Sequence, residues 1–171
     1  MRIRTPLAAL GFAAALAGTP LAGQSATHPG FSLSTGYGYG SLTCAHDYCA
    51  NAQGTFAGFV TVGKRLSKQL VVGVGSHAAY ITADDVTIMF SGIAQYTPAG
   101  APQLNLTAGA GIGSIGGGDV DGTGFAWVVG AGYNIPLGGS TALRPFVNYM
   151  SIAEPGGSTN VIQVGLAVGF N

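Results

Sequence analysis

The chain has 171 residues, the size of a single domain. Its 30 glycines, 7% charged residues and mean hydropathy of +0.41 are unlike a soluble globular protein, in which about 25% of residues are charged. Frequent aromatic and β-branched residues exclude an intrinsically disordered chain. Beyond the N-terminus, no run reaches the roughly 20 apolar residues that a membrane-spanning helix needs.

The N-terminus has the pattern of a secretory signal peptide. Arg2 and Arg4 form a basic start, an apolar core follows at 7–17, and small residues lie around 22–26. A true membrane helix is the alternative, and the short apolar core disfavours it. We therefore expect a signal peptide at 1–26, with cleavage somewhere within its last five residues.

Cleavage leaves residues 27–171 as the mature domain. Four basic residues then stand against six acidic ones, a net charge near −2 with neutral histidines. Since no basic patch remains, a nucleic-acid partner is not expected.

Further along, bulky apolar residues alternate with small or polar ones. In the first such run, Phe31, Leu33 and Thr35 lie on one parity, and Ser32 and Ser34 on the other. A period of two predicts β-strands with one bulky and one small face. Each run is near the 9–11 residues of a tilted membrane-spanning strand. The eight predicted strands, in chain order, are 30–43, 54–63, 69–81, 86–97, 104–114, 125–135, 143–151 and 162–170.

The connections between these strands are of two alternating kinds. Three are rich in turn residues and carry no acid, namely 63–68, 98–102 and 136–141. The other four, at 44–53, 82–85, 115–123 and 153–160, carry every acid of the chain: Asp47, Asp84, Asp85, Asp119, Asp121 and Glu154. This segregation is typical of a chain that crosses a membrane back and forth. If the chain starts in the periplasm, the acidic connections are extracellular loops.

The sequence therefore predicts an all-β fold, an eight-stranded antiparallel up-and-down transmembrane β-barrel. Closure is required because an open strand edge in lipid would leave backbone groups unpaired. Threading the strands up and down also places aromatic residues at both membrane interfaces. The predicted outer ring is Tyr39, Phe56, Tyr80, Phe125, Trp127 and Tyr149, and the inner ring is Phe31, Tyr96, Tyr133 and Phe170. A soluble lipocalin-like barrel is disfavoured because its outer face would carry charges.

The mature chain resembles the small eight-stranded outer-membrane β-barrel superfamily of the OmpA/OmpX type. The resemblance rests on the signal peptide, the strand pattern and the alternating run 161–170, which ends in an aromatic residue. It implies a location in the cell outer membrane of a Gram-negative envelope. It also implies that Phe170 is an assembly signal for the barrel-insertion machinery, although Asn171 follows it. Such a resemblance implies a fold rather than an activity.

Some barrels of this superfamily modify lipid A with a lipid-facing Ser and His near the outer rim. Here Ser76 and His77 are adjacent, so they point to opposite faces of a strand and cannot share a proton. Ala79 occupies the position where a second residue on the face of His77 would be needed. We expect His77 to be a lumenal polar side chain and the protein not to be an enzyme.

The lumen of an eight-stranded barrel is just wide enough for side chains to fill. Several inward positions are polar and predict a hydrogen-bonded plug: Gln95, Asn105, Thr107, Asn134, Arg144, Asn148 and Gln163. Arg144 is the one charge within a predicted strand. We expect it at the periplasmic rim, facing water or lipid headgroups, with a lumenal place as the alternative.

Cys44 and Cys49 lie in the first acidic connection. In an oxidising compartment, two such close cysteines predict a disulfide. A zinc site with His46 and Asp47 is the alternative.

Two other motifs are weak. The GxGxxG string at 111–116 opens no helix that would hold a phosphate. Asp119 and Asp121 lack the further ligands of a calcium loop. We therefore expect no metal and no cofactor.

Taken together, the sequence favours a non-enzymatic outer-membrane barrel with a structural or adhesion-like surface role. Expected partners are outer-membrane lipid and lipopolysaccharide, the barrel-insertion machinery and an unidentified extracellular partner. A lipid A-modifying enzyme and a narrow pore are the alternatives.

The cysteine pattern predicts that the mature protein carries no free thiol. Alkylation without reduction should leave the intact mass unchanged, and alkylation after reduction should label both Cys44 and Cys49. Labelling of either cysteine before reduction would contradict the disulfide.

Overall fold

The computed structural model describes residues 30–44, 52–80, 86–117, 120–154 and 157–170. Its eight long strands are β1 (Phe31–Cys44), β2 (Gln53–Arg65), β3 (Leu70–Tyr80), β4 (Val86–Tyr96), β5 (Leu104–Gly117), β6 (Val120–Tyr133), β8 (Thr141–Glu154) and β9 (Gly157–Phe170). A short strand, β7 (Ile135–Gly138), pairs with β8. Within these ranges, no helix is long and apolar enough to cross a membrane.

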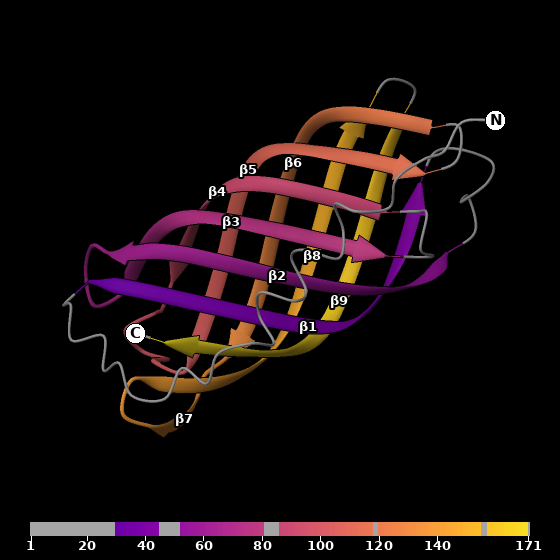
Figure 1. Ribbon diagram of the computed structural model, residues 1–171. Helices are drawn as coiled ribbons and strands as arrows, with labels where there is room; N and C mark the ends of the chain where they lie inside the picture. Colours follow the sequence, from indigo (N-terminus) through magenta and orange to yellow (C-terminus); the bar gives the residue numbers. More distant parts are fainter. Residues whose placement is uncertain (1–29, 45–51, 81–85, 118–119, 155–156, 171) are drawn as a thin grey trace, which may run out of the picture.

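The strands form one antiparallel sheet that closes into a barrel. Most pairs join consecutive strands, and two further pairings complete the ring: β1 with β9, and β6 with β8. Figure 1 shows the strands winding obliquely around the barrel, with β1 to β4 on the near side and β8 and β9 behind them. The predicted eight-stranded antiparallel barrel is confirmed.

The alternation read from the sequence sorts the side chains as expected. In β2, Thr55, Ala57 and Thr61 are buried, whereas Phe56 and Val62 are exposed. Since successive side chains of a strand point to opposite faces, the parity of Thr55, Ala57 and Thr61 lines the lumen and that of Phe56 and Val62 covers the outside.

Glycines let neighbouring strands approach closely where the sheet bends sharply. Gly38 of β1 lies opposite Gly165 of β9. A Cβ atom on Gly38 would overlap the carbonyl oxygen of Val164, and one on Gly165 would overlap that of Tyr37. Small residues at this contact are therefore a requirement of barrel closure.

The strands are longer at one end than the sequence pattern predicted. β5 and β6 are separated by residues 118–119 alone, and β8 and β9 by residues 155–156, so Asp121 and Glu154 belong to strand backbones rather than loops. The prediction was wrong here because glycine, hydroxyl and acidic residues are frequent in these extensions, so the apolar alternation stops before the strands end.

The connection predicted at 136–141 also contains structure that the sequence did not reveal. β7 continues the path of β6 past Asn134 and turns back into β8 through Gly138 and Gly139, with φ values of 115° and 56°. These positive φ values favour glycine, and Pro136 suits a short edge strand.

The close strand contact predicts a strong effect of adding one methyl group. We expect Gly38→Ala to lower the free energy of unfolding by about 1–3 kcal/mol, because the backbone oxygen of Val164 cannot move aside easily. Gly92→Ala is the matched control, since the nearest atom to its Cβ, the carbonyl oxygen of Ala110, lies at 3.9 Å. Urea unfolding of both variants in detergent measures the difference, and equal stabilities would contradict this account of the contact.

Candidate functional site

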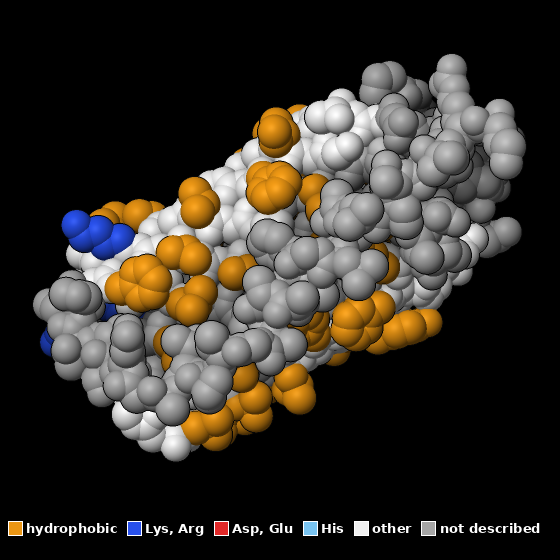
Figure 2. All heavy atoms as spheres, in the orientation of Figure 1, with side chains coloured by type: hydrophobic (Ala, Val, Ile, Leu, Met, Phe, Trp, Pro, Cys, Tyr) orange, Lys and Arg blue, Asp and Glu red, His pale blue; other side chains and the backbone are white. Residues whose placement is uncertain are grey.

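The outer surface is a continuous apolar band. Large apolar side chains are 60% or more exposed on several strands, among them Tyr39, Val74, Ile112, Phe125 and Val164. Figure 2 shows such side chains spread over the visible face, with Lys and Arg gathered at its left-hand end. An apolar surface of this extent is stable against lipid and unfavourable in water.

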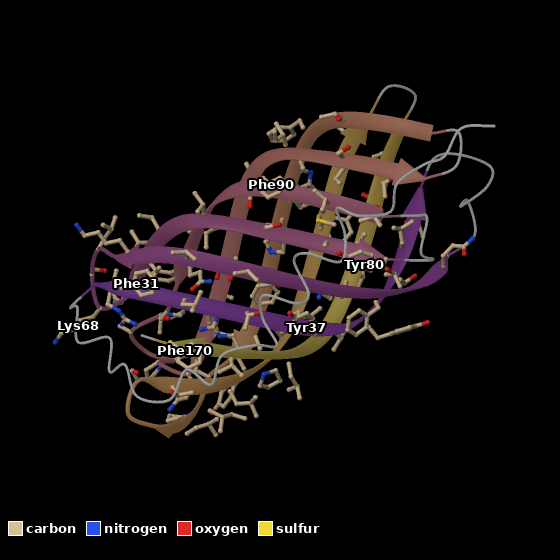
Figure 3. All side chains as sticks on the ribbon, viewed as in Figure 1. Phe31, Tyr37, Lys68, Tyr80, Phe90 and Phe170 are labelled. Atoms are coloured by element: carbon tan, nitrogen blue, oxygen red, sulfur yellow. The ribbon has the colours of Figure 1, made fainter. Side chains whose placement is uncertain are left out.

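The aromatic residues lie toward both ends of this band. At one end, Tyr39, Phe56 and Tyr80 stand opposite one another on β1, β2 and β3. Figure 3 shows Phe31 and Phe170 toward the end that carries Lys68, and Tyr80 away from it. Tyr37 and Phe90, which the sequence analysis left out of both rings, are exposed between the two ends.

One end of the barrel carries exposed basic residues. Lys64 and Arg65 are exposed at the end of β2, and Lys68 is exposed in the short connection to β3. This is the end at which β1 begins and β9 ends. The acid-bearing connections join the strands at the opposite end, which we call the outer end.

The outer half of the lumen is filled by an apolar layer. Its members are 0–8% exposed: Leu42, Ala57, Ala79, Met89, Ile115, Ala126, Val128, Met150, Ile152 and Val161. The sequence pattern did not predict this layer, because the inward parity was interpreted as small or polar. The available signal was the presence of Met89 between Thr87 and Ser91.

A second, aromatic level lies beneath the apolar layer. The ring of Phe59 packs edge-on against Phe146, with ring centroids 5.0 Å apart, and stacks on His77 at 5.6 Å. His77 is 4% exposed and lumenal, as predicted.

The inner half of the lumen is polar, and Arg144 belongs to it. Arg144 is 5% exposed, and its Nε donates a hydrogen bond to Oδ1 of Asn134 at 2.7 Å. The expectation that Arg144 faces water or headgroups at the rim was therefore wrong. The parity of β8 places Arg144 inward with Phe146 and Asn148, and Gly132 on β6 leaves room for its methylene groups.

The other predicted members of the polar plug also point inward. Gln95, Asn105, Asn148 and Gln163 are buried. Two hydrogen bonds connect members of this level: Thr107 Oγ1 donates to Asn105 Oδ1 at 3.3 Å, and Gln95 Nε2 donates to Thr61 Oγ1 at 3.5 Å. The inner lumen is thus partly hydrogen-bonded, less completely than a closed plug would be.

A small cavity remains in this polar half. Its volume is about 10 Å³, roughly the room for one water molecule. The cavity is lined by polar side chains and two aromatic rings: Phe59, Thr61, His77, Gln95, Asn105, Thr107, Arg144, Phe146 and Asn148, with Gly132. A space of this size does not form a path for solutes.

The structure separates the two residues that a lipid-modifying enzyme would need together. Ser76 stands on the outer face opposite Phe90 and Val60, whereas His77 is buried in the lumen. Asn105, the acceptor of a possible glycosylation sequon, is also lumenal, so no glycan fits there. The GxGxxG string lies within β5 and continues as strand to Gly117.

Several predicted site residues lie outside what the structure describes. These are residues 1–26, Cys49, Asp47, Asp84, Asp85, Asp119, and the side chains of Cys44, Asp121 and Glu154. The disulfide therefore stays a prediction, as does the placement of Asp47, Asp84, Asp85 and Asp119 in extracellular loops. Phe170 is the last residue of β9 and pairs with Leu33 and Thr141 at the inner end. Among the described residues, no cluster of metal-ligating side chains is present.

Comparison with known proteins agrees with this architecture. The sequence matches the family model of the outer membrane protein beta-barrel domain over residues 6–170. Neisserial surface protein A is similar in structure with 14% identity and a TM-score of 0.60, covering 82% of this chain and 96% of that one. The N-terminal β-barrel domain of Pseudomonas aeruginosa OprF is also similar, with 14% identity, a TM-score of 0.51, and coverage of 82% and 98%. No curated protein matches the sequence.

The apolar layer predicts which isoleucines matter for stability. Ile152 is fully buried, and its side chain occupies space that Gly113 leaves open. We expect Ile152→Ala to lower the free energy of unfolding by about 2–5 kcal/mol because it leaves a cavity. Ile162→Ala, on the half-exposed outer face of β9, is the control and should cost clearly less. Unfolding in detergent compares them, and a larger loss in the control would refute a packed lumen.

Proposed function

The chain belongs to the outer membrane protein β-barrel family and resides in the outer membrane, and we propose that it is a non-enzymatic anchor. It presents its acidic outer end to the cell exterior. Its role in this proposal is structural or adhesion-like. The barrel holds the connections between strands at the membrane surface, and those connections make the contacts.

The observation that carries the proposal is the filling of the lumen. The apolar layer around Met89, Met150 and Ile152 occupies the outer half, and buried polar side chains occupy the inner half. A pore would have to displace the apolar layer. The outer end is then the surface that is left for recognition.

The placement of Ser76 and His77 favours this role over lipid modification. A general base within hydrogen-bond reach of the nucleophile is the usual requirement for hydroxyl activation. His77 points into the lumen and stacks on Phe59, so its imidazole is not offered to a lipid substrate.

The partner that the charge pattern fits best is lipopolysaccharide. Its phosphates are anionic, and the acidic connections are anionic too, so direct contact would be repulsive. Divalent cations bridge carboxylate and phosphate oxygens readily, since both are hard oxygen ligands. Asp47, Asp84, Asp85, Asp119 and Asp121 would supply the carboxylates. An extracellular protein partner would use the same surface.

A charge-neutralised variant tests the proposed function. We expect replacement of Asp84, Asp85, Asp119 and Asp121 by Asn to weaken magnesium-dependent binding of purified barrel to lipopolysaccharide vesicles by about tenfold or more, corresponding to about 1.4 kcal/mol. The physical reason is the loss of bridging carboxylates. Binding is measured by vesicle flotation with magnesium and again with EDTA.

The matched control neutralises the opposite end, with Lys64, Arg65 and Lys68 replaced by Gln. Its magnesium-dependent binding should equal that of the wild type. Binding that is insensitive to EDTA, or weakened equally in both variants, would contradict the proposal. A change in lipid A mass on expression would instead establish an enzyme, and steady conductance in planar bilayers would establish a pore.

A further inference from the structure

Among the described residues, the guanidinium of Arg144 is a positive charge buried in the lumen. Arg144 is 5% exposed, and the one hydrogen bond described for it joins Nε to the neutral oxygen of Asn134. A guanidinium stays charged at every physiological pH. Burial of a charge without an opposite charge nearby is strongly unfavourable. An amide oxygen satisfies one N–H donor and leaves the net charge unchanged.

The acidic residues of the chain are badly placed to neutralise Arg144. Glu154 lies ten residues further along the same strand, about 33 Å away at the usual rise per residue. The other acids lie in or beside connections at the outer end. The apolar layer and the Phe59–Phe146 pair stand between that end and Arg144.

Most side chains that line the cavity beside Arg144 are polar and carry at least one hydrogen-bond donor. The amides of Gln95, Asn105 and Asn148 and the hydroxyl of Thr61 surround it together with His77. In the part of the chain that the structure describes, Nδ1 of His77 is buried without a hydrogen-bond partner. Oγ of Ser34, Oγ of Ser91 and Nε2 of Gln163 are also buried without a partner there, but these residues do not line the cavity.

We propose that this lumenal cavity is a binding site for one small monovalent anion, of which chloride is the natural choice. A single guanidinium calls for a single negative charge. The space, close to one water molecule in size, accommodates an ion of about that size after small side-chain adjustments and excludes sulfate, phosphate and organic acids. Amide and hydroxyl donors replace the hydration shell of the anion.

Binding at this site makes the stability of the barrel depend on the concentration of the anion rather than on ionic strength. An ion that binds only the folded state stabilises that state. Once the ion concentration exceeds the dissociation constant, the stabilisation grows with the logarithm of the ion concentration. For one site, the unfolding equilibrium constant then falls about tenfold for each tenfold rise in chloride. This property is independent of any partner at the outer end.

The experiment is urea unfolding of the purified barrel in detergent at constant ionic strength, with sodium chloride or sodium bromide exchanged for sodium gluconate. We expect chloride and bromide to stabilise the wild type with a single-site dependence, since gluconate is too large for the cavity. Arg144→Gln should lose this dependence, and Arg144→Lys, which keeps the charge, should retain part of it. Arg65→Gln, at an exposed position, should respond like the wild type.

The result that overturns the proposal is a wild-type stability that is the same in chloride and gluconate, or a chloride effect that persists in Arg144→Gln. Should Arg144→Gln fail to fold, wild-type crystals grown in sodium bromide give an independent answer. An anomalous bromide peak within contact of the Arg144 guanidinium supports the site. Water density alone at that position refutes it.

Discussion

The structure depends on the pairing of every strand edge. In hydrocarbon, an unpaired backbone N–H or C=O costs several kcal/mol, so a sheet that crosses a membrane must close. Here β1 pairs with β9 and β6 pairs with β8, so the long strands have neighbours on both sides. Closure then fixes the alternation of side chains, with one parity toward lipid and the other toward a narrow lumen. The close contact of Gly38 with Gly165 is a direct consequence.

The narrow lumen explains how polar groups are distributed. Along β8, the inward residues run from Arg144 through Phe146 and Asn148 to Met150 and Ile152, so polarity falls from the inner to the outer end. The apolar end resists water, whereas the inner end tolerates one charge and several amides. The lumen therefore acts as packed core and directs any surface function to the outer end.

Much of this fold could be predicted because its physical cause is local. Eight alternating runs, segregated acids and aromatic ends all follow from a chain that crosses lipid repeatedly. The inward place of Arg144 could not be predicted with the same certainty, since it depends on space left by Gly132 and on a hydrogen bond to Asn134, ten residues away. The strand extensions were missed because glycine and polar residues interrupt the apolar alternation there, and β7 was missed because Pro136, Gly138 and Gly139 predict a turn. The apolar layer was missed because inward parity was equated with small or polar residues.

The barrel is closed and inserted in the outer membrane, and heat-modifiability tests both properties directly: outer-membrane fractions are run on SDS gels unheated and boiled. A barrel closed by β1–β9 and β6–β8 pairing resists SDS until heated, so we expect a mobility shift confined to the outer-membrane fraction. A soluble periplasmic protein with no shift would contradict it and would favour a lipocalin-like barrel instead.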